Sequence, residues 1–102
     1  MKLHNWDPAD GPLSEPALIN KLEALGYRCT CYTYPPGTVF PEHSHNVDKI
    51  DAVLRGRFRL SMEGKNIILE AGDYLFVPKG MTHTAEVIGN EAVISIDAVK
   101  IS

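Results

Sequence analysis

Three of the four histidines are spaced in a way that suits a metal site. His43 and His45 are two residues apart in a segment expected to be extended, so both imidazoles project from the same face. His83 follows a turn containing proline and glycine and begins another expected strand. An antiparallel neighbour can bring it opposite the first two, with side chains about 5 Å apart. Three neutral imidazoles with open coordination positions suit a divalent transition metal such as Zn, Fe, Mn, Ni or Cu. His4, in the polar N-terminal arm, is expected to take no part.

The elements that must position these histidines are mostly strands. After Gly26 the hydrophobic period changes from 3.6 to 2, and glycine- and proline-rich turns recur about every ten residues. The expected strands are 27–34, 39–45, 50–54, 58–62, 67–69, 74–77, 82–88 and 92–99. With no helix between them, these strands predict an antiparallel sandwich or barrel.

One helix is expected before the first of these strands. Ser14 is suited to be its N-cap, and Pro16 falls in the first turn, where a missing N–H costs little. Apolar residues at helical spacing follow as far as Leu25, and Gly26 can end the helix. A chain of 102 residues has room for one domain. We therefore expect an N-terminal arm and helix over 1–26 that packs on a barrel formed by 27–102.

Two segments around the histidines contain glycines at defined positions, and we call these two segments the glycine frames. The first runs from Gly37 to Gly56 and encloses His43, His45 and Lys49. Its spacing resembles the first motif of the cupin superfamily, G-x5-H-x-H-x3,4-E-x6-G. The glycines of such a frame allow tight turns at strand ends.

The second segment runs from Gly72 through Pro78, Gly80 and His83 to Val87. It resembles the second cupin motif, G-x5-P-x-G-x2-H-x3-N, with valine in place of the asparagine. The resemblance implies an all-β fold, an antiparallel double-stranded β-helix or jelly-roll (cupin) barrel. It also implies that His43, His45 and His83 hold one divalent metal ion.

The first motif departs from the family at Lys49, which stands where the family has a glutamate ligand. A protonated ammonium cannot bind a cation and repels it. Asp51 is two residues further on and should share the inward face, whereas Asp48 should face outward. Asp51 could replace the missing ligand or pair with Lys49, and Lys49 could instead extend to the barrel mouth. Lys49 and Asp51 are the candidate catalytic acid–base residues.

The composition excludes several kinds of partner. The net charge of −3 argues against nucleic acid, which usually requires a basic face. No apolar run is long enough for a signal peptide or a membrane span, so we expect no membrane contact and a cytoplasmic location. Cys29 and Cys31 are too close in sequence to favour a disulfide and are expected to be buried or half-buried free thiols outside the metal site.

Three functions suit these features. The first is a metal-dependent enzyme, resembling dioxygenases or isomerases of the superfamily, that acts on a small anionic molecule. The others are a small-molecule sensor without catalysis and a barrel closed by a structural metal. For the enzyme, Tyr74, Phe76 and Met81 could line the cavity, although core packing is the favoured role for each. Segment 27–34 could pair across a homodimer.

Overall fold

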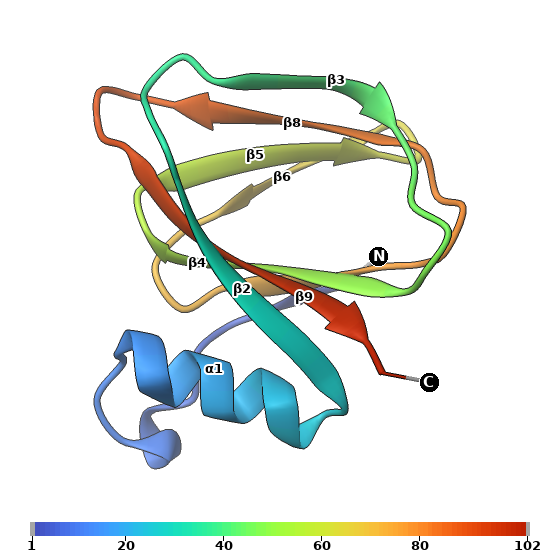
Figure 1. Ribbon diagram of the computed structural model, residues 1–102. Coiled ribbons are helices and arrows are strands. Elements are labelled where there is room, and N and C mark those ends of the chain that lie inside the picture. Colours follow the sequence, from blue (N-terminus) through green and yellow to red (C-terminus); the bar gives the residue numbers. More distant parts are fainter. Residues whose placement is uncertain (1, 102) are drawn as a thin grey trace.

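The computed structural model describes residues 2–101, which form two antiparallel sheets and one α-helix (Figure 1). One sheet has the strand order β1-β7-β4-β9-β2, and the other has the order β3-β8-β5-β6. The all-β barrel with one short N-terminal helix is thereby confirmed. The elements are β1 (Leu3–His4), the 3-10 helix η1 (Pro8–Asp10), α1 (Glu15–Ala24), β2 (Tyr27–Tyr34), β3 (Val39–His43), β4 (Lys49–Arg55), β5 (Arg57–Met62), β6 (Lys65–Leu69), β7 (Tyr74–Val77), β8 (His83–Ile88) and β9 (Val93–Lys100).

The alternation of side chains along the strands divides the buried apolar residues between two hydrophobic cores. On β4, Ile50 and Ala52 point away from the barrel and pack beneath α1. Val53 packs in the barrel interior with residues of both sheets. Because successive side chains of a strand point to opposite faces, Lys49 and Asp51 lie on the same inner side as Val53.

The helix covers the outer face of the five-stranded sheet, below β2 and β9 in the view of Figure 1. Its N-cap is Ser14, whose Oγ accepts a hydrogen bond from the backbone N–H of Ala17 at 3.2 Å. Leu18 and Leu22 are fully buried against the sheet. The helix ends at Ala24, one residue before the predicted end.

The N-terminal arm contributes a strand that the sequence analysis did not predict. Leu3 and His4 form β1, which pairs with β7 at the edge of the five-stranded sheet. Two residues are too short to show a period of two. The imidazole of His4 stacks on Tyr74, with ring centroids 4.9 Å apart. The proposed division of the chain at residue 26 stays a prediction, although the arm shares a sheet with the barrel.

A β-bulge in β3 changes the pairing register just before the first metal-site histidine. Phe40 lies opposite Ala85, whereas His43 lies opposite His83, so β3 has one more residue than β8 over this interval. In a regular strand, residues three apart point to opposite faces. The extra residue turns the side chain of His43 back toward the barrel interior. Phe40 and His43 therefore both line the same cavity.

A motif glycine has a steric role at the junction between the arm and the barrel. Gly72 has a φ of +89°, a region that L side chains rarely adopt. A Cβ at this position would also lie 2.5 Å from the Cβ of Trp6. Gly72 therefore lets the turn before β7 approach the N-terminal arm closely.

Two further expectations concern residues outside the site. Cys29 and Cys31 are both free thiols, as predicted. Cys29 is half-buried as expected, whereas Cys31 is exposed, so the expectation of burial was wrong for Cys31. Residues 2–101 contain no helix with the length and apolar character needed to cross a bilayer.

Candidate metal centre

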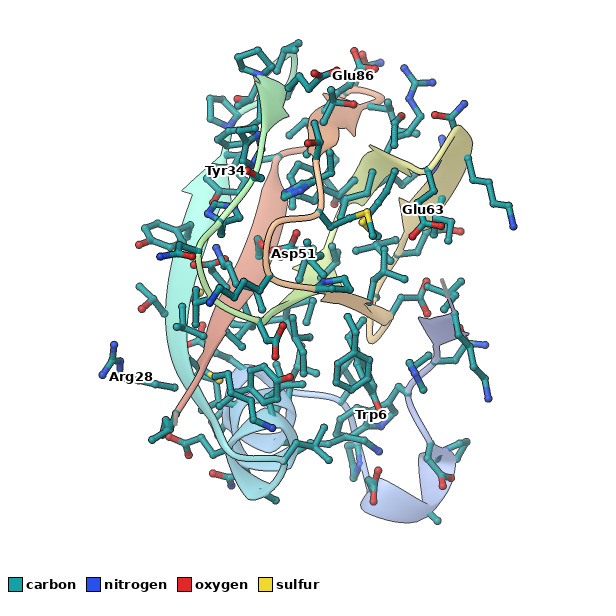
Figure 2. The ribbon with its side chains drawn as sticks, turned by 90° about the vertical axis from the view of Figure 1, so that its right-hand side faces the viewer. Trp6, Arg28, Tyr34, Asp51, Glu63 and Glu86 are labelled. Atoms are coloured by element: carbon teal, nitrogen blue, oxygen red, sulfur yellow. The ribbon has the colours of Figure 1, made fainter. Side chains whose placement is uncertain are left out.

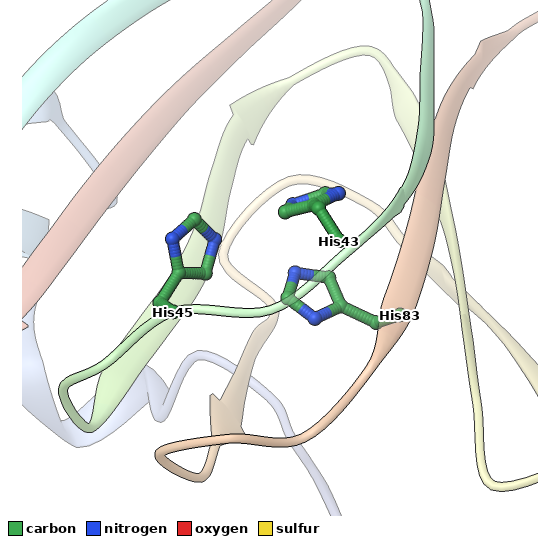
Figure 3. A group of neighbouring side chains, drawn as sticks. All are labelled: His43, His45 and His83. Atoms are coloured by element: carbon green, nitrogen blue, oxygen red, sulfur yellow. The ribbon is translucent and has the colours of Figure 1, made fainter.

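The fold brings the three predicted histidines together at the end of the β3–β8 pair (Figure 3). Each offers a ring nitrogen, and these atoms all lie within 4.8 Å of one another. The ring centroids are separated by 4.2 Å for His43 and His83, 4.9 Å for His43 and His45, and 5.3 Å for His45 and His83. Such separations allow three imidazoles to share a single cation.

The backbone sets the orientation of two of these rings. The Nδ1 of His43 is 2.7 Å from the carbonyl oxygen of Pro41, and the Nδ1 of His83 is 2.9 Å from that of Met81. A carbonyl oxygen only accepts hydrogen bonds, so Nδ1 carries the proton in both rings. The Nε2 atoms are therefore left with free lone pairs. A ligating histidine usually donates its other ring N–H to such a partner.

The surroundings also favour the neutral form of His83 and His45. Burial lowers the pKa of His83, which is 3% exposed, below its usual value. Burial lowers the pKa of His45 as well, and the positive charge of Lys49 adds to this effect. Because a metal binds the unprotonated nitrogen, the donor set fits a divalent transition metal.

The loop that carries His45 is tied to the loop that precedes His83. His45 follows the end of β3, and its carbonyl oxygen accepts a hydrogen bond from the backbone N–H of Gly80 at 2.8 Å. Gly80 belongs to the Pro-x-Gly turn of the second motif. This contact connects the two motifs of the sequence on the same side of the site.

The three histidines open into a cavity of about 400 Å³ in the barrel interior. This volume is in the usual range for small-molecule sites. Tyr34, Phe40 and Phe58 form its aromatic part, with ring centroids 4.9 to 6.1 Å apart. The lining residues are Tyr32, Tyr34, Phe40, Pro41, His43, His45, Lys49, Asp51, Phe58, His83, Ala85, Ser95 and Asp97.

Lys49 points into this cavity and forms an ion pair with Asp97 of β9. The distance from Nζ to Oδ1 is 2.6 Å, and the two side chains are 11% and 22% exposed. Asp51 was one expected partner of Lys49 from the sequence, but the ion pair is made with Asp97 instead. Asp48 lies outside the cavity, where its carboxylate accepts a hydrogen bond from the backbone N–H of Lys79.

Asp51 lies inside the barrel, as Figure 2 shows, and faces the cavity together with Lys49. In the same view Arg28 and Glu63 point outward. Burial raises the pKa of Asp51 to about 6, and the negative charge of Asp97 adds to the rise. Within residues 2–101, the group of potential ligand atoms holds the three histidines and does not include Asp51.

Asp97 and the aromatic part of the cavity were missed in the sequence. Ser95 and Asp97 are two residues apart in an otherwise apolar strand, and this pattern could have indicated a polar inner face. Of the aromatic candidates, Tyr74 is buried in the core beneath α1, which is the favoured packing role. Phe76 lies outside the cavity with 38% of its surface exposed. Met81 packs against the inner core.

Comparison with known proteins places this architecture in a family. Residues 31–99 match the model of the Cupin_2 cupin domain, and this segment includes both glycine frames and all three site histidines. The chain belongs to the cupin family. The resemblance found in its two motifs is thus confirmed.

Among curated proteins, this cupin is similar to a short part of acetate kinase EutQ. The match to the proteins from Salmonella typhimurium and Escherichia coli is 49% identical over 35 residues. It spans 34% of this chain and 15% of the EutQ chain. A similarity over so small a share of EutQ does not transfer the activity of the whole protein.

Many solved structures have a similar fold. KdgF from Halomonas sp. has a TM-score of 0.64 at 23% identity, over 76% of this chain and 72% of its own. A predicted oxalate decarboxylase from Thermotoga maritima has a TM-score of 0.66 at 24% identity, over 81% and 74%. The Cnp3 cupin domain of Schizosaccharomyces pombe has a TM-score of 0.68 at 17% identity, over 76% and 57%. Identities this low show a shared fold only.

Proposed function

We propose that this cupin is a metal-dependent enzyme that acts on a small anionic molecule. The observation that carries the proposal is the opening of the three-histidine group into a cavity that also holds ionisable side chains. A structural site would be expected to be closed by a fourth protein ligand, whereas a catalytic site keeps a position open.

His43, His45 and His83 would hold a divalent transition metal such as Zn, Fe, Mn, Ni or Cu. Such an ion supplies Lewis-acid or oxygen chemistry of the kind used by isomerases and dioxygenases. Since the three ligands are neutral, the ion keeps its full positive charge. The site thereby favours an anion as substrate.

The chain's own residues supply proton transfer and binding surface. Lys49 and Asp51 face the cavity beside the histidines and are the proposed acid–base residues. The pKa of Asp51, about 6, lies close to neutral pH, where a carboxyl group can both give and take a proton. The aromatic rings of Tyr34 and Phe40 exclude water and contact the apolar part of a bound molecule.

A non-catalytic sensor is the second candidate, because the same cavity could bind a ligand without converting it. A purely structural metal is the third. Removal of the metal by a chelator should affect these three candidate functions differently. The enzyme keeps its fold and loses turnover, the sensor keeps its fold and ligand binding, and the structural site loses its fold.

The deciding experiment follows a panel of small carboxylates by NMR in the presence of metal-loaded protein. Oxalate is a suitable first probe, since one structural neighbour is described as a predicted oxalate decarboxylase. The proposal expects conversion of a panel member that stops on chelation and in His43→Ala. A panel member that raises the melting temperature equally with and without metal, and is never converted, would establish the sensor instead. Unfolding on chelation would establish the structural metal.

A homodimer in the cytoplasm is part of the proposal. β2 forms one edge of the five-stranded sheet, and much of its eight-residue length is exposed. An unpaired edge strand offers backbone donors and acceptors to a second copy. Gly26 and Ile101 form a hydrogen-bonded pair, so along β2 the N–H groups of alternate residues, Cys31 among them, point away from β9. Cys31→Pro removes one of these free donors near the middle of β2, so sedimentation should then change from dimer to monomer. A monomeric wild-type chain would disprove the homodimer.

A further inference from the structure

A second carboxylate faces Asp51 across the sheet, and no feature of the two sequence motifs assigns it a role. Asp51 on β4 and Asp97 on β9 are direct partners in the antiparallel register, so their side chains emerge at the same height. Both line the cavity. We infer that Asp51 and Asp97 form one acid–base unit that holds a single proton, with Lys49 bound to Asp97.

The burial of the two carboxyl groups explains why they would share a proton. Two facing carboxylates that are shielded from water repel each other, so the second is hard to ionise while the first is charged. Asp97 has the Lys49 ammonium 2.6 Å away and is the one that is stabilised as an anion. Asp51 has no ion-pair partner within residues 2–101 and therefore retains the proton.

The other ionisable groups around Asp51 do not replace this arrangement. Its own strand contributes Lys49, β9 contributes Asp97, β3 contributes His43 and β2 contributes Tyr34. On β7, the residue opposite Asp51 is Leu75, which cannot titrate. Burial raises the pKa of Tyr34 to about 12, so this phenol stays neutral throughout the range in which a carboxyl group titrates.

A carboxyl pair with one proton has a use that a lone aspartate lacks. It presents a hydrogen-bond donor and an acceptor at one place, so it can give its proton to a bound anion and take a proton back. The exchange needs no oxidant and no second reactant. This use rests on the proposed function, and it makes Asp97 the acid–base partner of Asp51. The sharing of the proton itself depends on neither metal nor substrate.

The test is a pH titration of the aspartate side-chain carbons by ¹³C NMR, on the full chain without metal and again with zinc. In the wild type without metal, the Asp51 carbon should titrate near pH 6. In Asp97→Asn the midpoint of Asp51 should fall by at least one pH unit, because a neighbouring negative charge is lost.

Glu91→Gln is the control, because it removes an exposed carboxylate that pairs with Arg55 on the surface. It should leave the midpoint of Asp51 unchanged. The inference is overturned if Asp51 of the wild type titrates near pH 4, or if its midpoint is the same in Asp97→Asn. A wild-type midpoint near pH 4 overturns the inference even if a variant does not fold. Failure to convert any anion would remove the proposed function and leave this titration unchanged.

Discussion

His43 on β3 lies directly opposite His83 on β8, with their ring centroids 4.2 Å apart. The bulge that follows Phe40 makes this pairing compatible with an inward-facing Phe40. The strand thus places an aromatic side chain and a candidate metal ligand in the same cavity. The bulge in β3, more than its regular pleat, determines which side chains of this strand face the cavity.

Removing either member of this pair should lower metal content. His43→Ala and His83→Ala each leave two imidazoles, and we expect both to fall well below one metal ion per chain. Elemental analysis of the purified proteins measures this. His4→Ala is the matched control, since His4 stacks on Tyr74 away from the site, and it should retain wild-type content. Full occupancy in both site variants would disprove the proposed ligand set.

Breaking the internal ion pair should destabilise the barrel. Lys49→Met keeps the apolar stem and leaves Asp97 without its partner in a mostly buried position, at a cost of about 2–3 kcal/mol. Urea denaturation at pH 8 measures the free energy of unfolding. Arg55→Met removes an exposed pair with Glu91 and should cost less than about 1 kcal/mol. Equal effects of the two substitutions would show that the pair contributes no more than a surface contact.

Restoring the family's residue should strengthen metal binding. Lys49→Glu replaces a repelling ammonium by the carboxylate that cupins usually have at this position, and we expect the dissociation constant for Zn²⁺ to fall at least about tenfold. Competition with a coloured chelator measures it. Lys65→Glu makes the same charge change on exposed β6 and should have little effect. An unchanged affinity in Lys49→Glu would place residue 49 too far from the ion to act on it.

The raised pKa of Asp51 should make stability depend on pH in a defined direction. The folded chain holds this proton up to about pH 6, and the unfolded chain releases it near pH 4, so the contribution of Asp51 to stability is present below pH 4 and lost as the pH rises through 6. Asp51→Asn mimics the protonated form. Two pKa units correspond to about 3 kcal/mol, so the variant should gain up to that amount on the wild type between pH 4 and pH 8.

Urea denaturation of both proteins across this range measures the gain. The lowered pKa values of His45 and His83 act in the opposite direction, but they are common to both proteins and largely cancel in the difference. For Glu91→Gln the difference from the wild type should stay flat with pH, since that carboxylate is exposed. A flat difference for Asp51→Asn would show that Asp51 titrates normally in the folded chain.

The sequence predicted the parts of this structure that depend on local spacing. The strand Tyr27–Tyr34 has the predicted bounds, and Ser14 caps the helix as expected. His43 and His83 could be found from the spacing of strand residues within the two motifs. His45 lies in the loop after β3, although the predicted strand 39–45 included it, and was found from its position in the first motif. In each case the information lies within a few residues of the chain.

What the sequence did not predict depends on which strands become neighbours. Asp97 meets Lys49 and Asp51 because β9 pairs with β4, a contact between segments more than forty residues apart. The spacing of Lys49 and Asp51 gave no reason to look so far along the chain. Similarly, β1 is defined by its pairing with β7 and has too few residues to show a pattern.

The central claim is a metal ion held by His43, His45 and His83 with a position open to the cavity. X-ray absorption spectroscopy of the zinc-loaded protein tests it most directly. The account predicts three imidazole nitrogens at about 2.0–2.1 Å and at least one oxygen that is replaced when a small anion such as oxalate is added. A shell with a sulfur ligand, with fewer than three imidazoles, or with no exchangeable position would contradict it.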